Sequence, residues 1–377
     1  MVNINPEFWR GRSVFLTGHT GFKGGWLALW LHQLGATIHG YALDPPTTPS
    51  LFEAASIRSL LASDTRGDVA DAAALQKAVL AARPEIIFHL AAQPLVRVSY
   101  QNPTATFMSN VMGTAHLLDA ARACDHTRAI VAITTDKVYQ NREWIHPYRE
   151  NDPLGGHDPY SASKAAAEMV VAAYRSSFFE GPSGHRARIA TARAGNVIGG
   201  GDWALDRIVP DCLRAFAARQ PVTIRFPNAV RPWQHVLEPL AGYLQLGARM
   251  VGHDGRDYEG AWNFGPDSSD GARPVQWVVE RFLQEWGAGS WTTPEGASVQ
   301  PHEAHFLSLD SSKARERLPW TSVWDAVASV RHTAAWYRDY HQGVPARELA
   351  DRQLREYQGD AAAAHLLWAA TDQDSDT

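Results

Sequence analysis

The stretch FLTGHTGFKGGW, from Phe15 to Trp26, places glycines at three-residue spacing between two apolar runs. The run SVFLTG is typical of a strand, and the run KGGWLALWLHQLGA is typical of a helix. At such a turn, Gly18, Gly21 and Gly24 would let the backbone bend sharply and let a pyrophosphate approach the helix N-terminus, which favours negative charge. A purely structural turn would also use glycines, but the strand–turn–helix context favours a dinucleotide-binding site.

Strand-like and helix-like runs continue to alternate after this turn. Strands are predicted over 13–18, 37–43, 85–92, 129–135 and within 188–199. Helices are predicted over 23–36, 71–84, 109–124 and 160–179. Apolar strands that alternate with helices indicate an α/β fold, a doubly wound parallel sheet with helices on both of its faces.

The pattern becomes irregular after about Gly199, where Pro, Arg, Trp and His are frequent. Short strands are expected at 222–226 and 261–265, and helices at 237–250 and 274–286. The expected division of the chain has three parts, namely a dinucleotide-binding domain over 1–199 to which part of the later chain returns, a smaller C-terminal substrate-binding lobe over 200–365, and a disordered tail over 366–377.

Composition narrows the class of protein. The 377 residues carry a formal charge of −5, which gives no reason to expect nucleic acid as a partner. The two cysteines, Cys124 and Cys212, form neither a disulfide framework nor a metal-binding spacing, so we expect a reducing, cytoplasmic compartment and no bound metal. The longest apolar stretches fall short of a membrane span, so no membrane partner is expected.

Acidic residues after the glycine turn bear on the choice of cofactor. Asp44 lies 20 residues after Gly24, at the end of the second strand, where it could bind an adenosine ribose and repel a 2′-phosphate. This position favours NAD over NADP, although an ordinary turn before PPTTP explains Asp44 equally well. Asp68 could meet the adenine amino group, and HLAAQ (89–93) ends the fourth strand where the cofactor should cross the sheet.

Lys23 opposes the helix dipole unless a phosphate lies near it. The full set of residues expected to bind NAD is Gly18, His19, Thr20, Gly21, Phe22, Lys23, Gly24, Asp44, Asp68, Val69, Leu90, Ala91, Ala92, Gln93, Asn110, Tyr160 and Lys164.

Two motifs suggest the chemistry. In YSASK, Tyr160 and Lys164 lie four residues apart on one face of a predicted helix. Tyr160 could act as a base if a nearby ammonium and a nicotinamide cation lowered its pKa. The strand end ITTDKVY offers the hydroxyls of Thr134 and Thr135 and the carboxyl of Asp136 to a substrate hydroxyl. Each motif is common alone, and their combination is far more specific.

With these motifs the chain resembles the extended short-chain dehydrogenase/reductase superfamily from about Ser13 to Pro266. The resemblance rests on TGHTGFKG, HLAAQ, TTDKVY, YSASK and RAGNVIGGGDW. It implies a tightly held nicotinamide, a catalytic group of Thr135, Tyr160 and Lys164, and a nucleotide-sugar substrate in the C-terminal lobe. It also implies a homo-oligomer, a dimer or a dimer of dimers, in which helices 109–124 and 160–174 form the bundle between subunits.

Longer matches narrow the resemblance to the CDP-glucose 4,6-dehydratase family. They are GHTGFKGGWLALWL, TTDKVYQN, NDPLGGHDPYSASKAAAE, RAGNVIGGGDWALDRIVPD and RPWQHVLEPL. The dTDP and GDP branches carry Asp-Glu or Thr-Glu after the catalytic Thr, whereas Asp136-Lys137 is the cytidine version. The resemblance implies CDP-glucose as substrate, NAD as cofactor, and a product used in deoxysugar biosynthesis, including lipopolysaccharide O-antigen.

The chemistry of such a reaction assigns roles to residues. C5–H of a hexose becomes acidic only after C4 is oxidised, so Tyr160 would take the 4-OH proton while C4 gives up hydride. Lys137 would then remove the C5 proton and Asp136 would protonate the departing 6-OH, although the two could exchange tasks. Without the surrounding motifs, an exposed ion pair at a strand end would be the preferred interpretation of Asp136-Lys137.

Residue types also suggest a substrate site, because guanidinium groups match phosphate geometry and aromatic rings stack on sugars or bases. The candidates are Thr134, Asn196, Trp203, Arg207, Arg231 and His235. Two other functions stay open. A nucleotide-sugar 4-epimerase or reductase would need no acid/base pair at Asp136-Lys137, and a non-catalytic NAD sensor would need neither Tyr160 nor Lys164.

Overall fold

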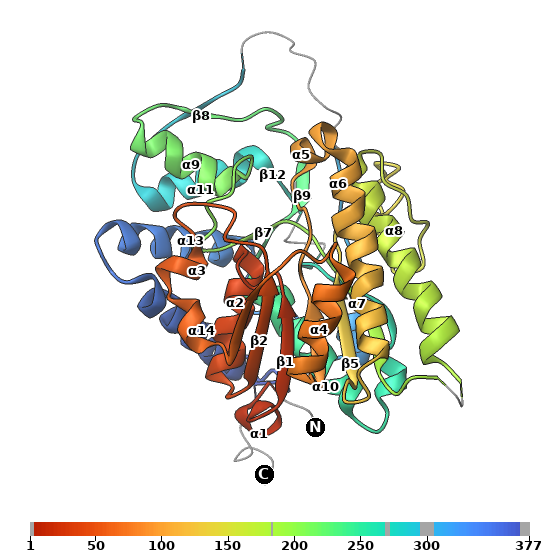
Figure 1. The fold of residues 1–377 in the computed structure, drawn as a ribbon. Helices are drawn as coiled ribbons and strands as arrows, with labels where there is room; N and C mark the ends of the chain where they lie inside the picture. Colours follow the sequence, from red (N-terminus) through yellow and green to blue (C-terminus); the bar gives the residue numbers. More distant parts are fainter. Residues whose placement is uncertain (1–3, 182–183, 268–271, 295–304, 370–377) are drawn as a thin grey trace.

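The computed structural model describes residues 4–181, 184–267, 272–294 and 305–369. Its centre is a seven-stranded sheet in which every pair of neighbouring strands is parallel (Figure 1). From one edge to the other the strands are β11 (Gly260–Phe264), β6 (Arg188–Ala194), β5 (Ala129–Ile133), β4 (Ile86–His89), β1 (Ser13–Thr17), β2 (Thr37–Ala42) and β3 (Ser63–Arg66). The predicted doubly wound parallel sheet is therefore confirmed.

Helices cover both faces of this sheet. Those of the first 200 residues are α1 (Pro6–Trp9), α2 (Phe22–Gln33), α3 (Leu51–Ala54), α4 (Ala72–Ala82), α5 (Val96–Gln101), α6 (Pro103–Phe107), α7 (Gly113–Arg122) and α8 (Pro159–Tyr174). Those that follow are α9 (Ile208–Ala217), α10 (Leu237–Val251), α11 (Val275–Trp286), α12 (Ser312–Arg317), α13 (Ala326–His341) and α14 (Ala346–Ala363).

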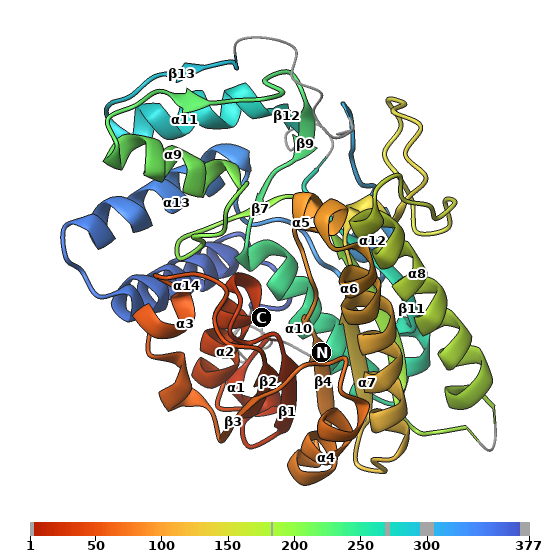
Figure 2. The ribbon, with the colours of Figure 1, turned by 45° about the horizontal axis from the view of Figure 1, so that its top comes forward.

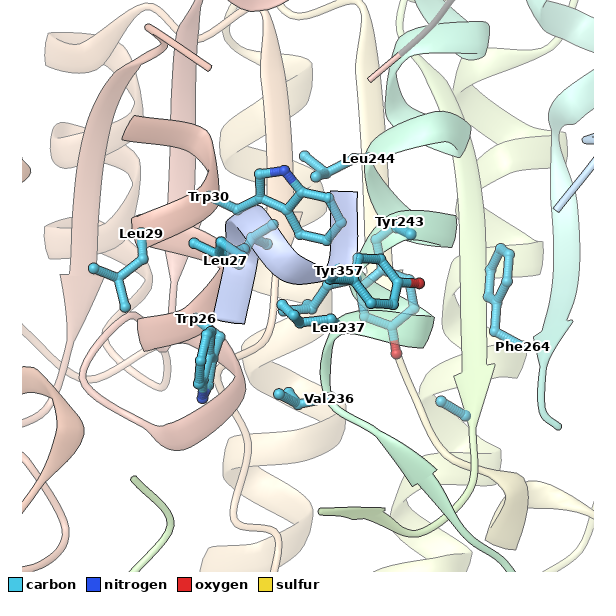
Figure 3. Packing of buried hydrophobic residues seen from close by; sticks show 14 of the residues in the cluster. Trp26, Leu27, Leu29, Trp30, Val236, Leu237, Tyr243, Leu244, Phe264 and Tyr357 are labelled. Carbon is cyan, nitrogen blue, oxygen red and sulfur yellow. The ribbon is translucent and has the colours of Figure 1, made fainter. Parts of the chain in front are cut away.

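Alternation along each strand separates the two faces, because successive side chains of a strand point to opposite sides. On β1, Val14 and Leu16 join one hydrophobic cluster, whereas Phe15 joins the other. The larger cluster contains α2, α10 and α14, and Figure 3 shows Trp30 of α2 beside Tyr357 of α14. The second cluster lies under α4, α7 and α8.

The strand order places a crevice at the carboxyl ends of β1 and β4. From β1 the chain proceeds outward to β2 and β3, and it then returns to β4 and proceeds the other way to β5 and β6. Ligands of open α/β sheets bind where the order reverses in this way. The glycine turn after β1 and the segment after β4 meet at this point.

A smaller lobe packs over the carboxyl end of the sheet (Figure 2). Its two-stranded ladders pair β7 (Val197–Ile198) with β10 (Gln234–His235), β9 (Val230–Pro232) with β12 (Ala272–Pro274), and β8 (Val222–Thr223) with β13 (Trp291–Thr292). Helices α9, α11 and α13 complete this lobe, with α11 packed between α9 and α13. The lobe stands above the crevice and closes it from one side.

Later parts of the chain return to the sheet domain. The segment expected as a strand at 261–265 is β11, which pairs with β6 as the seventh strand of the main sheet. Helix α10 packs against β5 and β6. In the segment expected as a tail, Trp368 is buried in the main core and its carbonyl accepts a hydrogen bond of 3.0 Å from Ile4 N, while 370–377 lie outside the described residues.

Among the described residues, no helix combines the length and the apolar character that a bilayer crossing requires.

Candidate active site

A cleft of about 1590 Å³ lies between the carboxyl ends of the strands and the lobe. It is lined by the glycine turn, the ends of β2, β4 and β5, the start of α8, and residues of the segments 194–215 and 220–233, which include the first turns of α9. All five residues of the expected catalytic group line it, namely Thr135, Asp136, Lys137, Tyr160 and Lys164. The expected cofactor residues that line it are Gly18, Thr20, Gly21, Phe22, Lys23, Gly24, Asp44, Asp68, Val69, Leu90, Ala91 and Ala92.

The three glycines of the turn serve two different purposes. Gly18 has φ +76°, and a Cβ on it would lie 2.7 Å from Ala91 N at the end of β4. A Cβ on Gly24 would lie 2.1 Å from Gly18 O. These two glycines are required by the protein's own backbone. A Cβ on Gly21 would meet only Gly18 O, at 3.4 Å, so the protein leaves space beside Gly21 where it lines the cleft at the N-terminus of α2.

Three residues expected at the cofactor support the cleft from behind and do not line it. His19 is buried, and its Nε2 lies 2.8 Å from Asp64 Oδ1 on β3. The Asn110 side chain accepts a hydrogen bond from Gln93 N (2.8 Å) and donates one to Ser163 Oγ (2.8 Å). Their polar side chains were expected to contact the cofactor. In the structure they form hydrogen bonds that connect neighbouring elements of the protein.

The two acidic residues near β2 and β3 lie at the outer end of the cleft. The Asp44 side chain is 89% exposed, and its Oδ1 lies 3.7 Å from Arg66 Nε. The Asp68 carboxylate accepts a hydrogen bond from Ala70 N (2.9 Å). Arg66 also lies over the ring of Phe52 at 4.6 Å, so a guanidinium stands beside the acid that was expected to repel a 2′-phosphate.

The turn after β5 holds the first half of the catalytic group. Thr135 Oγ1 accepts a hydrogen bond from Lys137 N (3.4 Å) and donates one to Asp136 Oδ1 (2.9 Å). Asp136 is only 2% exposed, and its Oδ2 has no hydrogen-bond partner within the described part of the chain. Burial raises the pKa of Asp136, against the opposing effects of Lys137, Thr135 and Arg231.

Helix α8 supplies the second half. Asp158 caps its N-terminus in a reciprocal capping box with Ser161, which fixes the first turn of the helix. Burial raises the pKa of Tyr160 to about 12, and a hydrogen bond with Thr135 partly opposes this. Lys164 donates from Nζ to Ile133 O (3.0 Å), and burial lowers its pKa to about 8. We expected Lys164 to lower the pKa of Tyr160. In the protein without ligands, burial instead raises this pKa.

Lys23 extends from the first turn of α2 into the same centre. Burial, together with the nearby charges of Arg207 and Lys164, lowers the pKa of Lys23 to about 8, and Asp136 acts in the opposite direction. The charges that act on Lys23 are therefore those of the catalytic cleft. A cation in this position fits an anionic ligand at the N-terminus of α2.

The expected substrate residues divide into those that line the cleft and one that does not. Thr134, Asn196, Trp203, Arg207 and Arg231 line it. The Thr134 hydroxyl, however, donates to Glu168 Oε1 (2.6 Å), and Arg207 pairs with Asp202 (2.7 Å). The expectation for His235 is wrong, because this side chain is fully buried between Trp26 and Trp324 and burial lowers its pKa well below the ordinary value.

Sequence reasoning missed Glu168, which is buried behind the catalytic turn. The available signal was its spacing, since it lies eight residues after Tyr160 and four after Lys164 on the same helix. No group of three or more His, Cys, Asp or Glu side chains that could hold a metal ion occurs among the described residues.

Comparison with known proteins finds similarity to nucleotide-sugar 4,6-dehydratases. The family model of GDP-mannose 4,6 dehydratase matches residues 15–182. A CDP-glucose 4,6-dehydratase of Salmonella typhimurium is 47% identical over 357 residues, which cover 94% of this chain and 98% of that protein. A dTDP-glucose 4,6-dehydratase of Streptomyces antibioticus is 28% identical, over 73% of this chain and 76% of that protein.

Solved structures share the fold at lower identity. A dTDP-glucose 4,6-dehydratase of Bacillus anthracis in complex with NAD superimposes with a TM-score of 0.71 at 19% identity, covering 88% of this chain and 98% of that chain. A UDP-glucuronic acid 4-epimerase of Bacillus cereus gives a TM-score of 0.72 at 18% identity, over 87% and 99% of the two chains. The fold is thus that of the extended short-chain dehydrogenase/reductases, among which both dehydratases and epimerases occur. Within this class, the full-length match at 47% identity shows that the chain belongs to the CDP-glucose 4,6-dehydratase family.

Proposed function

We propose that this protein converts CDP-D-glucose to CDP-4-dehydro-6-deoxy-D-glucose and water. The observation that carries the proposal is the pair Asp136-Lys137, which directly follows Thr135 on the wall of the cleft that also holds Tyr160 and Lys164. Oxidation at C4 alone needs only the Thr, Tyr and Lys. Elimination of water needs an additional base and acid, and this pair provides both. The 47% identity with a CDP-glucose 4,6-dehydratase supports the same reaction.

NAD is the proposed cofactor. The space beside Gly21 at the N-terminus of α2, with Lys23 close by, fits a pyrophosphate. Bound NAD would take the hydride from C4 and return it to C6. The carboxylate of Asp44 favours NAD over NADP, whereas the guanidinium of Arg66 beside it would tolerate the 2′-phosphate of NADP. The preference between the two cofactors therefore depends on which of these side chains contacts the adenosine ribose. Tighter binding of NADP than of NAD in a titration would contradict this assignment.

The residues of the cleft divide the proton transfers. Tyr160, hydrogen-bonded to Thr135, accepts the proton of the 4-hydroxyl. Lys137 removes the C5 proton, which the adjacent C4 ketone has made acidic. Asp136 protonates the departing 6-hydroxyl, because its raised pKa favours the protonated acid and its Oδ2 is free of other hydrogen bonds among the described residues. Arg207 and Arg231, which line the cleft, are the proposed ligands of the substrate diphosphate, because guanidinium groups match phosphate geometry.

We also propose a homodimer formed through the helices at 109–124 and 160–174. Large apolar side chains are exposed on these two helices and on the residues next to their ends, namely Phe107, Met108, Met112, Met169 and Phe178. Figure 2 shows α7 and α8 side by side at the surface. The free, buried thiols of Cys124 and Cys212 suit a reducing cytoplasm, where we place the enzyme. A monomeric mass of the wild type in light scattering would contradict the dimer.

The deciding experiment is incubation of the protein with CDP-, dTDP-, GDP- and UDP-glucose, with NAD supplied, followed by mass analysis. The proposed reaction yields a product lighter than CDP-glucose by one water. A 4-epimerase would yield a product of unchanged mass, and a protein that only senses NAD would yield none. If the protein dehydrated dTDP-glucose in preference to CDP-glucose, the proposed reaction would stand but the proposed nucleotide of the substrate would be wrong.

A further inference from the structure

Three side chains of α8 recur at four-residue spacing and therefore lie on one face of the helix. They are Tyr160, Lys164 and Glu168, and all three are buried. Lys164 Nζ donates to Ile133 O (3.0 Å), and Glu168 Oε1 accepts from Thr134 Oγ1 (2.6 Å). Helix α8 thus binds two consecutive residues, namely Ile133, the last residue of β5, and Thr134, which follows it. Both lie immediately before the turn that begins at Thr135.

Glu168 is itself fixed from the neighbouring strand. Arg193 of β6 donates from Nε to Oε1 (2.9 Å) and from Nη2 to Oε2 (2.9 Å), and Thr191 donates to Oε2 (2.7 Å). With Thr134, four donors surround the carboxylate. Such a bidentate pair with additional hydrogen bonds leaves the carboxylate little rotational freedom.

The network continues into the returning strand. Arg193 Nη1 donates to Tyr139 Oη (2.8 Å), and Tyr139 donates to Asn263 Oδ1 of β11 (2.7 Å). The chain of hydrogen bonds therefore joins α8, the end of β5, β6 and β11 behind one wall of the cleft. Because buried ion pairs contribute little net stability compared with apolar packing of similar volume, stability alone gives little reason for a network at this place.

We propose that Glu168 is a positioning residue of the proposed dehydratase, which sets the Thr135–Asp136–Lys137 turn at its working distance from Tyr160 and holds Lys164 in its charged form. The inference rests on the proposed function. Geometry supports the first part, because Glu168 and Lys164 hold adjacent residues, Thr134 and Ile133. Electrostatics supports the second, because a buried carboxylate one helical turn from an ammonium stabilises its charge.

The test is Glu168→Gln, which keeps the shape and removes the charge. We expect kcat to fall about 10- to 100-fold with the KM for CDP-glucose little changed, since small misplacement of reacting groups costs rates of this order. We also expect the alkaline limb of the kcat–pH profile to move to lower pH, because Lys164 loses the neighbour that raises its pKa. Glu168→Asp should recover part of both effects.

Thr191→Val is the matched control, because it removes one hydrogen bond to Glu168 and leaves the charge in place. It should lower the melting temperature without moving the alkaline limb. Glu168→Gln leaves the buried charge of Arg193 without its ionic partner, which could prevent folding. In that case the double variant Glu168→Gln/Arg193→Met is tested instead, with the same measurements of kcat, KM and the kcat–pH profile.

An unchanged alkaline limb, or a fall in kcat no larger than that of Thr191→Val, would overturn the positioning role while leaving the proposed function intact. A wild type that forms no dehydrated product from any nucleotide sugar would overturn both together, and the mass analysis separates the two cases.

Discussion

At the scale of single residues, burial dominates the chemistry of the cleft. It raises the pKa of both Asp136 and Tyr160, and it lowers the pKa of Lys164 and Lys23 to about 8. For Asp136 this direction suits an acid. For Tyr160 it opposes a base, so its proton transfer must draw on Thr135 and on positive charge that arrives with the ligands.

Replacement of Tyr160 by Phe tests its role as the base. We expect Tyr160→Phe to lose about 10²- to 10⁴-fold in kcat, the usual contribution of general-base catalysis, because C4 can no longer be oxidised. Binding of CDP-glucose should remain near wild type, since the hydroxyl is a small part of the binding surface. Calorimetric titration and initial rates measure the two quantities. Turnover close to that of the wild type would remove Tyr160 from the mechanism.

Replacement of Lys137 separates oxidation from elimination. Lys137→Ala should still oxidise C4 but stall before the C5 proton is removed, so enzyme-bound NADH should accumulate. Its near-ultraviolet absorbance in a single turnover is the measurement. A variant that releases dehydrated product without such accumulation would exclude Lys137 as the C5 base.

Asp136 has a complementary signature. Asp136→Asn should slow loss of the 6-hydroxyl while leaving exchange of the C5 proton with solvent deuterium partly intact, because only the acid is removed. Mass analysis of recovered sugar nucleotide in deuterium oxide reports both events. Loss of exchange and elimination together would show that Asp136, and not Lys137, acts at C5.

At the scale of elements, the turn between β1 and α2 predicts opposite outcomes for two glycines. Gly24→Ala places a methyl 2.1 Å from Gly18 O, so the helix must move from the strand and the melting temperature should fall. Gly21→Ala meets only one atom, at 3.4 Å, so the apoprotein should stay near wild type in stability while its affinity for NAD drops. Thermal melts with and without NAD distinguish the two. Equal stability of both variants would contradict this division of purpose.

Elements with strong local patterns were predicted well. The helix containing YSASK was expected at 160–179, and α8 spans Pro159–Tyr174 because an Asp cap and an alanine-rich interior specify it locally. The segment 261–265 was recognised as a strand but expected among the irregular segments of the lobe. A five-residue apolar strand carries no information on its partner, since pairing with β6 is a long-range contact.

The same limit applies within the candidate site. Residue types predicted that Thr135, Asp136 and Lys137 lie in the candidate site, and all three line the cleft. They directly follow a strand of a parallel sheet, and ligands of such sheets bind at the carboxyl ends of the strands. They did not identify the orientation of His19, Asn110 or His235, whose polar side chains turn into the protein. Which way a side chain turns depends on its tertiary neighbours, which a sequence pattern does not contain.

At the scale of the whole molecule, one buried acid ties distant segments together. Glu238 at the start of α10 accepts hydrogen bonds from Trp324 N (2.8 Å), Val323 N (3.0 Å) and the Tyr357 hydroxyl (2.9 Å). Burial nevertheless raises its pKa from 4.5 to about 7. The folded state therefore binds this proton more tightly than the unfolded state does.

This linkage predicts a pH dependence of stability. Between about pH 4.5 and 7 the unfolded state loses the proton first, so ionisation of Glu238 destabilises the fold as pH rises. The difference in unfolding free energy between wild type and Glu238→Gln should decline over this window and level off above it. Urea titrations at several pH values measure it, with Glu356→Gln on exposed surface of α14 as the control. A difference independent of pH would contradict the raised pKa.

The contact of Tyr357 and Trp368 with Trp30 has a consequence for how the protein is made. The apolar face of α2 is synthesised early, yet Trp368, which covers it, is added 335 residues after α2 ends at Gln33. At ordinary elongation rates of ~5–20 residues per second, this is a delay of roughly 17–67 s. During that time Trp30 lacks its native contact with Tyr357 of α14. A nascent chain arrested near residue 340 should therefore bind holdase chaperones on the ribosome, whereas one extended well past Trp368 should release them.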